Sequence, residues 1–240
     1  MFRDLASGQE IAAVAENVKE TSRCTWLKTG EASVQTVEHL LSALSALEVC
    51  DAIIESSGGE VPAADGSSAP FVRLLLEAGL CEQPGTSQVL TLAKPIFVTA
   101  DDGSAIAALP SDSLRVTVTL HYPQYAWIGT QAAHYDSSTD NYLTEIAPAR
   151  TFGFLREIDW LRAHGLGLGA SYENALVLRE EGYDGSLRFA NELARHKVLD
   201  VIGDLSLIGR PLAAHVLAFR PSHTLNVRLA QLLRSRLGRD

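Results

Sequence analysis

Two residues at helical spacing are the strongest indication of chemistry in this sequence. His196 and Asp200 lie four positions apart in the segment RHKVLD. On a helix, residues i and i+4 project from the same face one turn apart. Imidazole nitrogen and carboxylate oxygen both bind zinc, so the pair can hold a metal ion. The same spacing is common among solvated pairs on helix surfaces, and the two interpretations stay open at this point.

His39 is the natural third ligand, because catalytic zinc takes about three protein ligands and keeps one position open. It follows Glu38 in TVEHLLSALSAL, and aligning EHLLSALSAL with RHKVLDVIGDL places His39 over His196. Glu38 would then stand beside the metal without binding it, in a position to take a proton from water. A Glu-His pair after a helix cap is also frequent on exposed surfaces.

Three more residues could complete such a site. His223, in RPSHTLN, is a candidate acid or base, and Asp204 continues the helical face of Asp200 and can orient a neighbour through a hydrogen bond. Lys197, beside His196, can contact an anion. Each also has an ordinary structural or solvated interpretation.

The elements that must position these residues follow from apolar periodicity. Helices are expected over residues 36–47, with Thr36 as a possible N-cap, and over 71–78, 157–164, 189–208 and 224–237. Strands are expected over 51–55, 88–93, 105–109, 114–122, 175–178 and 213–219, with those between 88 and 122 forming a meander. Residues 125–139 are polar and predict irregular structure.

A Pro, Gly and Ser-containing stretch, EQPGTSQ over residues 82–88, predicts a domain boundary. It divides the chain into a first domain, 1–84, and a second, 85–240. Because strands and helices occur in each half, the fold class expected is α+β, with two sandwiches side by side.

The composition of the 240 residues excludes several classes of protein. The excess of 29 acidic over 20 basic residues gives a net charge of −9, which argues against a general nucleic-acid binder but leaves small anionic ligands open. Three cysteines without a CxxC pair favour neither a disulfide framework nor a cysteine zinc site. The sequence has no apolar run at its start and no stretch of about 18 apolar residues, so it predicts neither a signal peptide nor a membrane span. We therefore expect a cytoplasmic protein, with peripheral membrane contact left open.

Two common enzyme classes find no support. The glycines of GLGLG, residues 165–169, lack the preceding strand and following helix of a dinucleotide fingerprint. No Ser or Cys stands in a nucleophile-elbow context, so a covalent hydrolase is not indicated either.

Several long blocks resemble the zinc-dependent UDP-3-O-acyl-N-acetylglucosamine deacetylases of lipid A biosynthesis. They begin with TVEHLLSALSALEVCDAIIE and EVPAADGSSAPFV and continue with ARTFGFLREIDWLRAHGLGLGAS, LRFANELARHKVLDVIGDLSLIG and SHTLN. They span both halves in the order of the family. The resemblance implies two similar α/β sandwich domains with the active site in the cleft between them.

The resemblance also assigns roles to residues. It implies one zinc ion per chain, held by His39, His196 and Asp200, with Glu38 as the general base. His223 falls on the family's essential histidine, thought to act as a cation that stabilises the oxyanion and a candidate proton donor to the amine. The remaining carried-over positions are Thr151 for the oxyanion, Phe152 and Lys197 for the substrate, and Asp204 for orienting the histidine.

The substrate implied is a UDP-linked acylated aminosugar, with its acyl chain in an apolar passage near residues 168–187. One departure is at the start, where the family normally has further strands, and their loss would remove apolar cover from residues 36–47. Two alternatives remain: a catalytically reduced homologue that binds a nucleotide-sugar or a protein partner, and a related metal-dependent N-deacylase with another substrate. The oligomeric state is not predicted.

Overall fold

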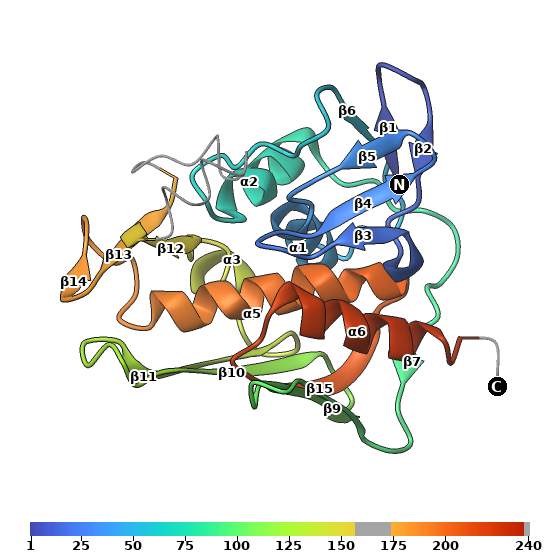
Figure 1. Ribbon diagram of the computed structural model, residues 1–240. Coiled ribbons are helices and arrows are strands. Elements are labelled where there is room, and N and C mark those ends of the chain that lie inside the picture. The colour runs from blue at the N-terminus through green and yellow to red at the C-terminus, as the bar shows by residue number, and fades with distance from the viewer. Residues whose placement is uncertain (157–173, 238–240) are drawn as a thin grey trace.

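A computed structural model describes residues 1–156 and 174–237 of the chain. Within them the protein has an α+β fold in layers, with β-sheets on the outside and helices between them (Figure 1). Helices α1, Glu38–Ala46, and α5, Glu192–Leu205, meet in the middle of the molecule and pack against each other. The fold class expected from the sequence is therefore confirmed.

The N-terminal half contains two three-stranded sheets. One has the order β2-β1-β6, and the other has the order β3-β4-β5. The bounds are β1 Phe2–Asp4, β2 Glu10–Ile11, β3 Val18–Glu20, β4 Trp26–Thr29, β5 Ala32–Val34 and β6 Ile54–Ser56, with a 3-10 turn at Ala15–Asn17. Helices α1, Glu38–Ala46, and α2, Ala69–Ala78, pack against each other. Leu41 and Leu44 of α1 are buried, so this helix keeps an apolar cover.

The start of α1 differs from the prediction. Thr36 does not cap the helix, because its hydroxyl donates instead to Glu60 Oε1 at 2.9 Å and no side chain caps the first turn. Its backbone has φ +58°, a left-handed conformation that is unusual for a β-branched residue. The helix therefore begins directly with Glu38 and His39.

The C-terminal half is built on one six-stranded sheet with the order β11-β10-β15-β9-β8, in which β7 also pairs with β15. The bounds are β7 Leu90–Thr91, β8 Ile96–Thr99, β9 Ala105–Pro110, β10 Arg115–Tyr122, β11 Gly129–Asp136 and β15 Leu212–Phe219. The predicted meander is wrong, because β15 lies between β9 and β10, antiparallel to the first and parallel to the second. Local alternation predicts hairpins but cannot show that a later strand separates them.

Strand β11 corrects a second expectation, since residues 125–139 were predicted to be irregular. In this edge strand Ala133 and Tyr135 point into the core, while Thr130, Ala132 and His134 are more exposed. Its first inward positions, 129, 131 and 133, are Gly, Gln and Ala, so the hydrophobic alternation that identifies a strand is weak there.

Three helices in the described part of this half lie on the sheet or beside it. They are α3 Tyr142–Glu145, α5 Glu192–Leu205, extended by a 3-10 turn at Ser206–Ile208, and α6 His223–Arg234. Helix α5 contacts β10 and β11 on one side and α1 on the other, and most of its residues are buried. Its carboxylates and its histidine consequently lie between the two halves of the chain.

A small fourth sheet completes the described fold. Strands β12 Phe152–Phe154, β13 Leu176–Arg179 and β14 Gly182–Tyr183 are ordered β12-β13-β14, with β12 and β13 parallel. Residues 176–178 of the expected acyl passage are buried in β13. The predicted helix at 157–164, the GLGLG segment and residues 168–173 of the expected passage lie outside the described residues. The linker at 82–88 is exposed and has no helix or strand, and the division of the chain there stays a prediction.

Candidate metal centre and active site

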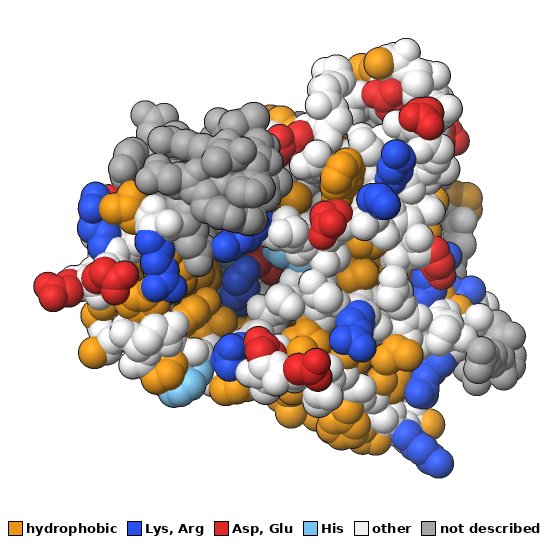
Figure 2. Space-filling model, in the orientation of Figure 1, with side chains coloured by type: hydrophobic (Ala, Val, Ile, Leu, Met, Phe, Trp, Pro, Cys, Tyr) orange, Lys and Arg blue, Asp and Glu red, His pale blue; other side chains and the backbone are white. Residues whose placement is uncertain are grey.

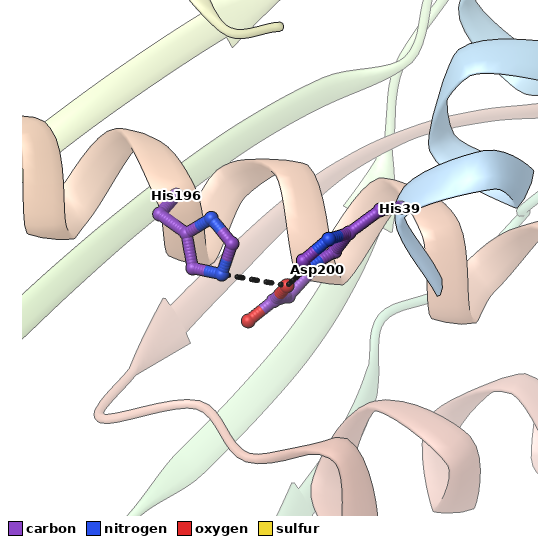
Figure 3. A group of neighbouring side chains, drawn as sticks. All are labelled: His39, His196 and Asp200. Carbon is purple, nitrogen blue, oxygen red and sulfur yellow. Dashed lines mark ion pairs between the residues drawn. The ribbon is translucent and has the colours of Figure 1, made fainter. Parts of the chain in front are cut away.

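Two helices from opposite halves of the chain bring three metal-ligating side chains together (Figure 3). His196 Nε2 lies 3.3 Å from Asp200 Oδ1 along α5, and His39 Nε2 on α1 lies 3.6 Å from the same oxygen. The two imidazole rings are almost perpendicular, with centroids 5.0 Å apart. All three residues are buried, and one ligand atom from each falls within 4.8 Å of the others.

The protonation of His196 suits a metal ligand. Its Nδ1 lies 3.1 Å from the carbonyl oxygen of Ala149, which can only accept, so Nδ1 carries the proton and Nε2 keeps a lone pair. Burial lowers the pKa of His196 to about 3, despite the nearby carboxylate of Asp200. The imidazole is therefore neutral at pH 7, the form that binds metals.

The surroundings of the Asp200 carboxylate indicate that His39, His196 and Asp200 together fit a cation. Its Oδ1 is buried and makes no hydrogen bond within the described part of the chain, although it faces two imidazole nitrogens. Its Oδ2 accepts from Lys197 Nζ at 2.6 Å. Burial raises the pKa of Asp200, but its neighbours, Lys197 among them, outweigh that effect and hold this pKa well below the usual range. An ionised carboxylate oxygen beside two imidazole nitrogens is a donor set that zinc takes in proteins.

A second buried group lies next to these ligands. Glu38 Oε1 lies 3.9 Å from His223 Nε2, and that nitrogen lies 4.0 Å from Asp200 Oδ2. Asp204 Oδ2 accepts from His223 Nδ1 at 2.9 Å. Glu38, His223 and Asp204 are thereby linked across the two halves and stand next to Asp200.

Burial and charge set the protonation of this second group. Burial raises the pKa of the Glu38 carboxyl, and the neighbouring imidazoles offset only part of that effect. For His223 burial lowers the pKa, but Asp204 and Glu38 outweigh it and raise the pKa to about 9. The site therefore combines a carboxylate of raised pKa, suited to accept a proton, with an imidazole held as a cation.

Close backbone contact fixes the two helices that carry the ligands. A Cβ at Gly203 of α5 would overlap the backbone carbonyl of Glu38, so only glycine permits this approach.

On α6, Ser222 accepts a hydrogen bond from the Leu225 N–H at 3.3 Å and caps the helix, which places His223 at its first position.

Phe152 and Lys197 lie beside the ligands. The Phe152 ring centroid is 6.1 Å from that of His196, and Lys197 Nζ lies 5.4 Å from the centroid of the Phe152 ring. Burial lowers the pKa of Lys197, but Asp200 outweighs it and raises this pKa, so the ammonium stays charged. Thr151 precedes Phe152 and is held through its backbone. Its N–H donates to the Gly66 carbonyl, and its carbonyl accepts from the Leu176 N–H.

Three residues that support this group were not predicted from the sequence. Thr25 donates to Glu38 and Asp204, and the amide of Asn226 donates to Asp204 Oδ2 at 2.9 Å. The carbonyl of Ala149 holds His196. Thr25 and Ala149 lie outside helices and strands, where periodicity carries no information. Only the position of Asn226, three residues after His223 on one helix, is a signal that could have been used.

Known families place the chain in a class of deacetylases. Residues 1–235 match the family described as UDP-3-O-acyl N-acetylglycosamine deacetylase, and the chain belongs to that family. The resemblance seen in the sequence blocks is thus confirmed.

Curated relatives carry the name UDP-3-O-acyl-N-acetylglucosamine deacetylase. The chain is 43% identical to the Chlamydia pneumoniae protein over 94% of its own length and 81% of that relative. It is 42% identical to the Pseudomonas entomophila protein over 96% of itself and 77% of the relative, and 38% identical to that of Acinetobacter baumannii over 97% and 78%.

The described surface adds two observations about partners. On the face seen in Figure 2, Lys and Arg side chains are interspersed with Asp and Glu, and they form no continuous basic surface among the residues shown. No helix in residues 1–156 or 174–237 has both the length and the apolar character needed to cross a membrane.

Proposed function

We propose that this protein is a zinc-dependent deacetylase that hydrolyses the N-acetyl group of a UDP-3-O-acyl-N-acetylglucosamine and releases acetate, as a step of lipid A biosynthesis. The observation that carries the proposal is the junction of two groups: His39, His196 and Asp200 converge beside Glu38 and His223. The names of the relatives supply the substrate. The proposal includes one zinc ion per chain.

The chemistry divides between the metal and the side chains. Zinc held by His39, His196 and Asp200 would supply Lewis acidity and make a water molecule more acidic. Glu38 is not among the three convergent ligands, and its buried carboxylate would accept the proton of the attacking water. The His223 imidazolium would stabilise the negative charge that develops on the carbonyl oxygen.

Proton delivery to the departing amine involves the same two residues. Glu38 would hold the proton taken from water, and His223, with its raised pKa, would already carry one. Their facing atoms are 3.9 Å apart, so both stand beside the same space. Asp204 would keep the His223 ring oriented through Nδ1.

The substrate roles of Thr151, Phe152 and Lys197 are part of the proposal. Phe152 and Lys197 stand beside His196, where an aromatic face and an ammonium would contact the sugar. The Thr151 hydroxyl would donate to the oxyanion. All three cysteines are free thiols, which supports a reducing compartment and hence the cytoplasm.

The test is acetate release from a UDP-3-O-acyl-N-acetylglucosamine by the purified protein. Release should stop when a chelator removes the metal and return with added zinc. UDP-N-acetylglucosamine without the acyl chain, and the acylated sugar without UDP, are the substrate controls. Equal rates on all three would indicate an N-deacylase of another specificity. Zinc binding without any turnover would indicate a non-catalytic homologue.

A further inference from the structure

Thr25 occupies an unusual position between the two halves of the candidate active site. It precedes β4 and is fully buried. Its backbone N–H donates to Glu38 Oε2 at 3.1 Å, and its hydroxyl donates to Asp204 Oδ1 at 2.5 Å. Its carbonyl accepts from the Val37 N–H at 3.4 Å, just before α1. One residue of the first half is thus bonded to both acids that flank His223.

The hydroxyl of Thr25 completes the hydrogen bonding of Asp204. Asp204 is fully buried, and its Oδ2 accepts from His223 Nδ1 and Asn226 Nδ2, each at 2.9 Å. Its Oδ1 accepts from Thr25. Without that donor, Oδ1 would be a buried acceptor with an unmet hydrogen bond, and the carboxylate could rotate to share its remaining donors.

Rotation of Asp204 would move His223, because Nδ1 of the imidazole is bonded to it. The opposite nitrogen, Nε2, faces Glu38 Oε1 at 3.9 Å. The amide of Thr25 holds the other oxygen of the same Glu38 carboxylate. Thr25 therefore fixes Glu38 from one side and, through Asp204, fixes His223 from the other.

We infer that Thr25 is a positioning residue for the deacetylation reaction, setting the placement of the His223 imidazole relative to the Glu38 carboxylate. The inference rests on the proposed function for its effect on catalysis. It concerns the hydroxyl, since any residue at this position supplies the backbone amide. A small movement of His223 is enough for this effect, because misplacement of a reacting group by about 1 Å can cost about 100-fold in rate.

The experiment compares Thr25→Val, which removes the hydroxyl with nearly the same shape, with Thr25→Ser, which keeps it. For Thr25→Val we expect kcat to fall about 10- to 100-fold with KM changed by less than about threefold, and Thr25→Ser to restore kcat to within about threefold of wild type. Zinc content should be unchanged in both. Equal losses in the two variants, or no loss in Thr25→Val, would overturn the inference.

Thr21→Val is the matched control. The Thr21 hydroxyl also joins the two halves, through Thr224 Oγ1 at 2.7 Å, but it contacts neither Glu38 nor Asp204. Its kcat should stay at the wild-type value. A loss as large as that of Thr25→Val would show that the effect comes from loosening the contact between the halves, and would overturn the role assigned to Thr25.

Histidine NMR supplies a readout independent of turnover. The Nδ1–H proton of His223, identified by its loss in His223→Gln, should be protected and shifted downfield in wild type and Thr25→Ser, and broadened or lost in Thr25→Val. If Thr25→Val does not fold, Thr25→Ala gives the same comparison. An unchanged signal without the hydroxyl, or no protected signal in wild type, would overturn the inference. Failure of the proposed function would instead appear as no acetate release by wild type, with this signal intact.

Discussion

Gly203 lies so close to Glu38 that a side chain at this position would overlap the backbone carbonyl of Glu38. The contact sets the separation of α5, which carries His196 and Asp200, from α1, which carries His39. The proposed zinc site takes ligands from both helices at once, so the absence of a Cβ at residue 203 matters to the proposed chemistry as well as to packing.

Gly203→Ala should therefore weaken both stability and metal binding. Overpacking at a helix contact costs about 1–3 kcal/mol of unfolding free energy, and the displaced helix would move His39 from its partners. Chemical denaturation and zinc titration measure the two effects. Gly153→Ala is the control, since a Cβ there meets no atom of the described chain within 4 Å. Unchanged zinc affinity in Gly203→Ala would show that the helix separation does not govern the site.

His196→Ala should lose zinc. Removal of a ligand is expected to reduce affinity by more than the about 10- to 100-fold that changes to the groups supporting a ligand cost. His215→Ala is a suitable comparison, because His215 lies on β15 and bonds to Thr117 rather than to the cluster. Competition with a fluorescent zinc indicator gives both affinities. Equal affinities would place the metal elsewhere.

Glu192→Ala should destabilise the protein strongly. The Glu192 carboxylate is fully buried, pairs with Arg150 at 2.9 Å, and accepts the Arg188 backbone N–H at 2.6 Å. Removing one member of a buried pair costs about 3–5 kcal/mol, because the other charge loses its partner. Asp184→Ala, which breaks the more exposed pair with Arg179, should cost much less, because water screens this pair. Denaturant midpoints of the two variants would reveal whether burial makes this difference.

Asp136 should make stability depend on pH below about pH 4. Hydrogen bonds from Ser138 and Ser113, together with Arg115, hold the pKa of Asp136 well below its ordinary value of 3.8. Because the folded-state pKa is the lower one, the stabilisation is complete above the unfolded value and is lost as the pH falls through the folded value.

The Asp136→Asn variant tests that dependence. It should be less stable than wild type at pH 7, by about 1 kcal/mol, and the difference should shrink as the pH falls below 3.8. Thermal unfolding across pH 2.5–7 gives the comparison, with Asp112→Asn, an exposed residue before β10, as the control. A difference that stays constant with pH would indicate that the ionised carboxylate contributes nothing.

The sequence predicted the parts of this structure that depend on local spacing. The helical face that joins His196 to Asp200 and Asp204 is apparent from positions i, i+4 and i+8. The hypothesis that His39 is the third ligand requires α1 and α5 to meet, and they do. The position of β15 between two hairpins could not be predicted in this way, because strand order depends on contacts between distant segments.

Thr25 illustrates the same limit at the site. It precedes a short strand and is 179 positions from Asp204, so no periodicity connects the two. The error at Thr36 has a related cause: a threonine before a helix usually caps it, but here the hydroxyl finds Glu60 in a different segment. Tertiary partners, which the local sequence does not show, decide where such polar side chains point.

Glu38→Gln tests the central claim most directly, when zinc content and acetate release are measured on the same preparation. Glutamine keeps an oxygen to accept the Thr25 amide but cannot take a proton. The expected result is one zinc ion per chain, as in wild type, with acetate release from the UDP-linked substrate reduced about 100- to 10,000-fold. Loss of zinc in Glu38→Gln, or acetate release at the wild-type rate, would contradict the proposed mechanism.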